Sequence, residues 1–144
     1  MNYPLLLTAH LLAAFVFIGT VFFEVIMLEG IRQHVPRDAM RAVEIAIGNR
    51  ARRIMPWVLL LLYGAGIGMA WYHRAALASP GSSVFSLLLT LKIILAISVF
   101  GHFLTAMTML HKGTMTGRRS KTIHISIFCH VIAIVLLAKF MFYA

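Results

Sequence analysis

Acidic side chains are scarce in this 144-residue chain. Four Asp and Glu stand against thirteen Lys and Arg, which gives a formal net charge of +9 at pH 7. Charged residues of both signs make up 12% of the chain, whereas soluble domains carry about 25%. The hydrophobic classes reach 61% and the mean hydropathy is +0.92. This balance excludes an ordinary soluble domain and predicts an all-α integral membrane protein, with a single transmembrane domain over residues 1–144.

Cysteine is almost absent, and so are several catalytic patterns. The one cysteine, Cys129, excludes an intramolecular disulfide, and its place in an apolar segment predicts a buried thiol. Serine-hydrolase, phosphate-loop, CxxC and HExxH patterns are missing, which gives no support to hydrolase or kinase chemistry. No basic stretch precedes the first apolar run, so we expect a retained helix and not a cleaved signal peptide. We also find no convincing internal repeat.

Four apolar segments are long enough to cross a bilayer, which takes ~20 residues. They cover about residues 3–28, 54–72, 84–110 and 123–143. Six basic residues lie between the first and second segments, and four lie between the third and fourth. The positive-inside rule places these connections in the cytoplasm and both termini outside. Short links favour adjacent antiparallel helices, so the expected architecture is a four-helix bundle.

Two further features concern the second segment. Asp38 follows Pro36, and apolar residues then alternate with charged ones, which predicts a short amphipathic cytosolic helix at the inner surface before the second span. Within the span, Gly64 and Gly68 form a G-x-x-x-G pair, which lets a neighbouring backbone or a flat ligand approach closely. Helix packing is the favoured interpretation, and a cofactor groove is the alternative.

The first segment carries two ionisable side chains, His10 and Glu24. Fourteen helical steps leave them ~40° apart around the axis, so they share one face. An ionisable group in hydrocarbon costs ~3 kcal/mol on insertion scales and therefore usually faces a partner or a cofactor. We expect His10 to be a ligand or part of an outer substrate or propionate site. Glu24 is expected to accept protons toward the cytoplasm.

The third and fourth segments each carry a deep histidine. His102 lies ~12 Å from the inner end of its helix and His130 ~9 Å from the inner end of the next, which predicts a common depth. Two imidazoles on adjacent antiparallel helices at one depth suit the axial positions of a b-type haem. We therefore predict haem b held by His102 and His130. Ser98 and Thr105 on the same face are expected to hydrogen-bond the second imidazole nitrogen or leave room for the ring edge.

Lys92 is the other deep ionisable group. It lies ~12 Å into the third segment from the outside, and His10 lies ~10 Å into the first, so these two also share a predicted depth. A buried ammonium attracts a carboxylate such as a haem propionate, or takes part in proton transfer. Lys92 is therefore a candidate cofactor-binding and catalytic residue, alongside Glu24.

A copper site is the alternative, because thioether groups suit Cu(I) and the chain holds nine methionines. Met107, Met109, His111 and Met115 cluster at the inner end of the third segment. However, Met107 and Met109 point ~200° apart on a helix and cannot chelate together without a break. A third, non-catalytic interpretation is a structural or assembly subunit whose polar residues bond across a homo-oligomer.

Two stretches resemble known families. The run HLLAAFVFIG, with His10 nine residues before Gly19, resembles the first helix of copper-resistance D (CopD) membrane domains, and LTLKIIL around Lys92 resembles the lysine-bearing later helix of that group. The layout of four spans with a histidine in the first and a lysine in the third is similar to the HemJ-type protoporphyrinogen oxidases, which bind haem b. The resemblance implies functional positions at His10 and Lys92.

Together these observations predict a haem b-binding redox or electron-transfer protein, multi-pass in the bacterial inner membrane. Its expected partners are the lipid bilayer and a quinone, a porphyrin or a redox protein. An enzyme of this kind would be a haem-dependent oxidoreductase. A copper-handling protein and a HemJ-like oxidase remain the alternatives. The position of the basic residues indicates topology and attraction to anionic headgroups, and excludes nucleic acid as a partner.

Overall fold

The computed structural model describes residues 2–143, which are all-helical, with 88% helix and no strand in that range. Four helical stretches are long and apolar enough to cross a membrane. They are Tyr3–His34, Arg37–Tyr72, Val84–His111 and Gly117–Phe140. Each of the four predicted apolar segments falls on one of them. The chain divides into two compact units, and the division lies between Tyr72 and His73.

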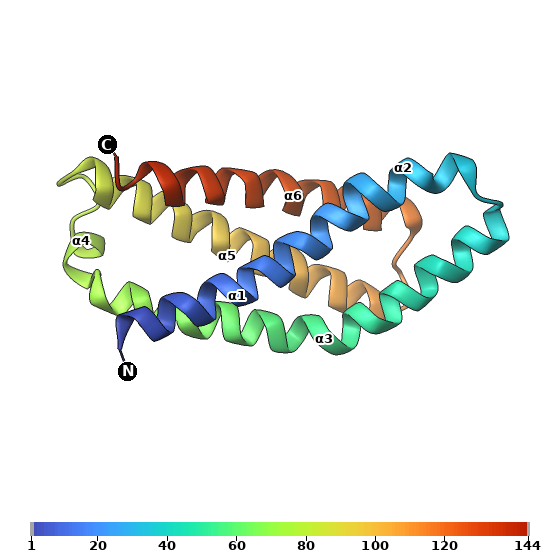
Figure 1. Cartoon of the computed structure of the whole chain (residues 1–144), viewed down its shortest axis with the longest axis horizontal. Coiled ribbons are helices and arrows are strands. Elements are labelled where there is room, and N and C mark those ends of the chain that lie inside the picture. The colour runs from blue at the N-terminus through green and yellow to red at the C-terminus, as the bar shows by residue number, and fades with distance from the viewer. Residues whose placement is uncertain (1, 144) are drawn as a thin grey trace. The chain divides into compact units, whose positions relative to one another are not determined.

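The first unit is a pair of long helical stretches that pack along each other (Figure 1). Helix α1 (Tyr3–Phe22) has Pro4 in its first turn, where the missing N–H costs nothing. It continues through the π-helix η1 (Phe23–Leu28), the short α2 (Glu29–Ile31) and the 3₁₀ turn η2 (Arg32–His34). Helix α3 (Arg37–Tyr72) then runs back beside α1.

Helix α3 differs from the prediction at its cytosolic end. The expected short amphipathic helix is not a separate element, because residues 37–72 form one helix of 36 residues. It begins as predicted after Pro36, whose carbonyl accepts the N–H of Met40 at 2.9 Å. Pro56 removes one backbone donor but lies inside the helix without ending it. A helix of this length spans ~54 Å, well beyond the ~30 Å of a bilayer core.

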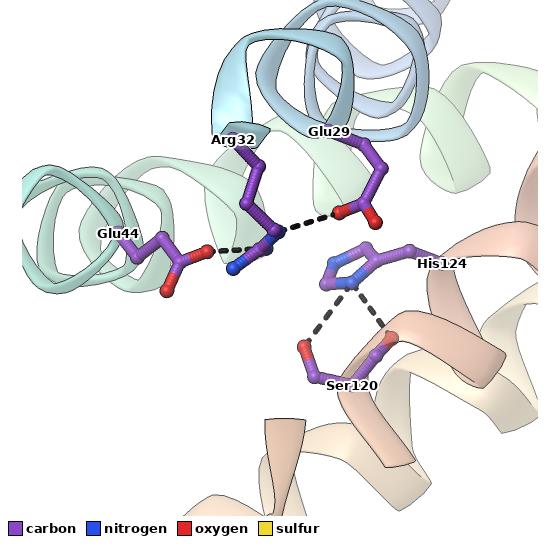
Figure 2. Close-up of polar contacts among 5 residues, drawn as sticks. All are labelled: Glu29, Arg32, Glu44, Ser120 and His124. Carbon is purple, nitrogen blue, oxygen red and sulfur yellow. Dashed lines mark hydrogen bonds and ion pairs between the residues drawn. The ribbon is translucent and has the colours of Figure 1, made fainter. Parts of the chain in front are cut away.

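An ion-pair network joins the end of the first helical stretch to α3 (Figure 2). The Arg32 Nε–H donates to Glu29 Oε2 at 2.9 Å, and Arg32 Nη2 pairs with Glu44 Oε1 on α3. The Arg32 side chain is 50% exposed and both carboxylates are 34% exposed. The network is therefore solvated, and water and salt screen most of its energy.

We expect Glu44→Gln to lower the free energy of unfolding by only ~0.2–1 kcal/mol, because exposed ion pairs contribute little. The difference from wild type should vanish near ~1 M salt, where the screening length falls to ~3 Å. Thermal unfolding in detergent at low and high salt measures both effects. Arg41→Gln is the control, since no ion pair of Arg41 is found in residues 2–143. A loss above ~2 kcal/mol that persists at high salt would contradict this assignment.

The second unit contains α4 (Arg74–Ala78), α5 (Val84–His111) and α6 (Gly117–Phe140), with α5 and α6 packed along each other (Figure 1). A serine pair fixes the connection between α4 and α5. The Ser83 hydroxyl accepts the N–H of Ser86 at 3.1 Å and caps α5. Ser86 is fully buried, and its hydroxyl donates toward the carbonyl groups of Ala76 and Ser79. These bonds hold the short connection onto the first turn of α5.

Candidate functional site

His10 lies on α1 and reaches across to α3. Its Nδ1 is 2.9 Å from the backbone carbonyl of Leu62, 52 residues away in sequence. A carbonyl can only accept, so Nδ1 carries the hydrogen and Nε2 is the nitrogen with the lone pair in the neutral ring. Gly66 makes this approach feasible, because a Cβ atom there would lie 3.3 Å from His10 Cε1. The helix pair therefore fixes both the position and the tautomer of this imidazole.

The glycines of the GAGIG run in α3 differ in their contacts with α1. Leu6 Cδ1 lies 3.0 Å from where a Cβ of Gly68 would be, so Gly68 serves helix packing as predicted. Gly64 has no such neighbour within 4 Å among the described residues. The second glycine in close contact with α1 is Gly66, which lies against the His10 ring. The G-x-x-x-G spacing does not single it out, although the run GAGIG contains it.

Glu24 lies in a different backbone conformation from the one assumed in the sequence. It is the second residue of the π-helix η1, and its side chain is partly buried. Because regular α-helical rotation ends at Phe22, the predicted ~40° angle to His10 does not carry over unchanged. Single π-helical turns inside α-helices are rare and occur frequently at functional sites. Glu24 therefore stays a candidate proton acceptor.

Lys92 is partly buried and lies in the first third of α5. Within residues 2–143 it takes part in no hydrogen bond or ion pair. Its own unit offers no carboxylate, since all four acidic residues precede Tyr72 in the sequence. An ammonium group in an apolar segment, with no carboxylate in its own unit, suits an anionic ligand.

His102 and His130 come together on α5 and α6, with ring centroids 5.2 Å apart and ring planes tilted by 56°. His102 Nδ1 lies 2.7 Å from the Ser98 carbonyl, and its Nε2 lies 2.9 Å from the Ser126 hydroxyl. His130 repeats the arrangement, with Nδ1 2.8 Å from the Ser126 carbonyl and Nε2 3.1 Å from the Ser98 hydroxyl. We call these four residues the serine–histidine clamp. Each helix supplies one serine and one histidine, and each serine hydroxyl contacts the histidine of the other helix.

The clamp sets the register of α5 against α6 at the two histidines. Each histidine lies opposite the serine that comes four residues before the other histidine. The backbone positions of the two histidines are thus one helical turn, or ~6 Å, apart along the helices. Each ring bonds back to the carbonyl four residues before it, so the ring centroids are only 5.2 Å apart. A different sequence signal indicates this register, and counting residues from the helix ends misses it: SVFGH from Ser98 and SIFCH from Ser126 are copies of one short pattern.

The repeat also explains which residues face the helix contact. Val99 and Ile127 occupy the same place in the two copies, and both are buried. Cys129 follows two residues after Ile127 and is exposed, so the prediction of a buried thiol is wrong. Gly101 stands at the corresponding place in the first copy and is exposed too.

A hydrogen bond from Nδ1 to the carbonyl four residues earlier is also made by a histidine near the end of a helix. His124 Nδ1 lies 2.9 Å from the Ser120 carbonyl and 3.3 Å from its hydroxyl, both within one turn of α6 (Figure 2). His10, His102 and His130 each make a polar contact with a second helix of their own unit. The positions of those three side chains are therefore determined by helix pairs and not by one helix alone.

The Nδ1 bonds of the clamp are those of haem-ligating histidines, but its Nε2 atoms are not placed to ligate an iron. An Nδ1–H donated to a carbonyl is the usual support for a ligating imidazole. However, each Nε2 faces a serine hydroxyl of the opposite helix. Two rings in trans on one iron, with bonds of ~2 Å, have centroids ~6 Å apart and a porphyrin between them. Joint ligation by His102 and His130 therefore requires both serine contacts to open, and it stays a prediction.

A metal site made of several side chains would be a different kind of centre. Among residues 2–143, no group of three or more His, Cys, Asp or Glu could hold a metal ion. Helix α5 is regular through His111, so Met107 and Met109 project ~200° apart as predicted. The copper alternative thus gains no specific geometry.

Comparison with protein-family models, with curated proteins and with solved structures finds no match for this chain. The resemblance to CopD-like and HemJ-like proteins therefore rests on the two short stretches around His10 and Lys92.

Proposed function

We propose that this protein crosses the membrane four times, binds haem b and transfers electrons, with His10 as an axial ligand. The observation that carries the proposal is the contact of His10 Nδ1 with the Leu62 carbonyl over Gly66. Because Nδ1 donates to this carbonyl, the lone pair of the neutral ring is on Nε2, which would be the ligating atom. The bond also orients the ring from a second helix, as in ligating histidines generally. The apolar surroundings of α1 favour a large, flat, hydrophobic cofactor.

The proposed topology follows from the four apolar helices and from the charges between them. The ten basic residues of the two connections lie on the cytoplasmic side, which places both termini outside. An inner membrane of a bacterium is the proposed location. Nucleic acid is not a proposed partner, because the positive charge serves this topology.

Lys92 is the proposed partner for an anion, either a haem propionate or an acidic group of a substrate. Its lack of a hydrogen bond or ion pair within residues 2–143 supports this role. Haem b would supply the one-electron chemistry, and the chain would bind and orient it. Electrons would pass to or from a quinone, a porphyrin or a redox protein, and Glu24 would accept protons.

One absorption spectrum, with elemental analysis of the same purified sample, tests the proposal. We expect a Soret band, an α-band that sharpens on addition of dithionite, and about one iron per chain. Copper without a Soret band would overturn the haem proposal in favour of the copper alternative. A sample with neither pigment nor metal after expression with a haem supply would overturn both and favour the structural subunit.

A further inference from the structure

We propose that Arg50, Arg53 and Trp57 of α3 form a binding site for the phosphate headgroup of an anionic lipid in the inner leaflet. The proposal rests on the proposed membrane crossing of α3 and is independent of the haem. It goes beyond a general attraction of basic residues to headgroups, because it assigns the lipid to two of the six arginines between the first and second spans.

The six arginines of this region differ in what they already contact. Arg32 is paired with the carboxylates of Glu29 and Glu44. Arg52 Nη2 donates to the side-chain oxygen of Asn49. Within residues 2–143, no hydrogen bond or ion pair is found for the other four, which are Arg37, Arg41, Arg50 and Arg53. All four are exposed, so their guanidinium groups are accessible to a ligand.

Two of these four arginines lie where α3 enters its apolar run. Arg53 is the last charged residue of α3, and residues 54–72 carry no charge. Arg41 lies twelve residues before Arg53, ~18 Å along the helix, and Arg37 lies ~24 Å before it. Both distances exceed the ~8–10 Å over which charges act in physiological salt. Of the four, only Arg50 and Arg53 are therefore level with the headgroups.

Arg50, Arg53 and Trp57 share one face of α3. At 100° per residue the three positions fall within ~60° of one another, and Trp57 is 72% exposed. Leu60 and Leu61, one turn further along the same face, are exposed as well. Indole rings are enriched at headgroup level in membrane interfaces. The face thus changes from basic to amphipathic to apolar, in the order of the headgroup, glycerol and acyl chains of a phospholipid.

Two guanidinium groups on neighbouring turns suit one phosphate. Residues three apart on a helix have Cβ atoms ~5–6 Å apart, and each guanidinium offers a planar fork of N–H donors that matches phosphate oxygens. The nearest acidic residue of α3 is Glu44, which pairs with Arg32. The charge therefore favours an anion, and the exposed apolar residues beside it favour a lipid over an acidic protein surface.

Quenching of Trp57 fluorescence by brominated lipid tests the proposal. The chain has two tryptophans, so Trp71→Phe leaves Trp57 as the only one. This protein is placed in phosphatidylcholine nanodiscs with a small share of either brominated phosphatidylglycerol or brominated phosphatidylcholine. We expect phosphatidylglycerol to quench preferentially. In the same background, Arg53→Gln should lower the preference about 5-fold, the usual contribution of one arginine near an anionic surface. The double variant Arg50→Gln, Arg53→Gln should abolish it.

The double variant Arg37→Gln, Arg41→Gln is the matched control, because it removes the same charge from the same helix ~18–24 Å before Arg53. It should retain the preference. Circular dichroism verifies that each variant is folded. No preference in the Trp71→Phe protein, or equal loss in the two double variants, would overturn the proposal.

Soluble competitors and the second lipid separate the remaining outcomes. Inorganic phosphate or polyglutamate that displaces brominated phosphatidylglycerol from Trp57 would overturn the proposal, in favour of a free phosphate or of an acidic protein. Quenching by neither lipid would overturn the membrane crossing of α3, and the lipid site with it. Equal quenching by both lipids would overturn the lipid site alone.

Discussion

Haem affinity is expected to fall at least ~100-fold in His10→Ala, since losing even a supporting contact of a ligating histidine costs about 10–100-fold. The ring bonds the Leu62 carbonyl at 2.9 Å and packs against Gly66, and α1 contains no second histidine that could replace it as a ligand. Titration of the detergent-solubilised apoprotein with haemin, followed at the Soret band, measures the affinity. A pyridine haemochrome assay gives the bound amount per chain.

The control separates loss of the ligand from loss of the fold. His124→Ala removes a histidine that hydrogen-bonds Ser120 within one turn of α6 and should retain the haem. Added imidazole should restore a Soret band to His10→Ala, because the free ligand can occupy the space left by the missing ring. Unchanged affinity in His10→Ala would show that the axial ligand lies elsewhere, with His102 and His130 as the next residues to replace.

The four long helices could be predicted from the sequence because run length and apolar content alone determine them. The ends of these helices could not be predicted in the same way. The charged residues before Arg53 suggested a separate surface helix, yet α3 continues through Pro56 to Tyr72. A proline costs a helix one donor and a steric clash, and inside a packed helix pair other contacts offset that cost. The π-helix at Phe23–Leu28 had no signal in the sequence at all.

The register of the deep histidines shows a second limit. Counting residues from predicted helix ends aligns the backbone positions of His102 and His130, whereas these are one turn apart, since α6 begins at Gly117 and not near residue 123. The register is set by size and polarity, because a large imidazole on one helix faces a small serine on the other. The repeated Ser-x-Phe-x-His pattern contains that information, whereas distance from the helix end does not.

His10 bonds a backbone carbonyl of α3, and a carbonyl has no sequence signature. Every residue of α3 has one, and the choice of Leu62 depends on the single position where the missing Cβ of Gly66 lets the ring pass. The sequence could thus name His10 as a candidate functional residue. It could not say what orients the ring.

Gly66→Val is expected to lower the free energy of unfolding by ~1–3 kcal/mol, the usual cost of overpacking a well-filled contact. Its Cβ would lie 3.3 Å from His10 Cε1 and 3.4 Å from Nδ1, and the two further methyl groups need more room. The ring must then move off the Leu62 carbonyl, so haem affinity should fall together with stability. Thermal unfolding in detergent and the Soret titration measure the two effects in the same sample.

Gly64→Val is the matched control, because it makes the same substitution two residues away in the same helix. A Cβ at Gly64 meets nothing within 4 Å in residues 2–143, and glycine and valine are both weak helix formers. Gly64→Val should therefore change stability by less than ~0.5 kcal/mol, as surface substitutions usually do, and leave haem affinity unchanged. If the two variants behave alike, the space above Gly66 does not position His10, and the contact with Leu62 loses its role in the proposed ligand site.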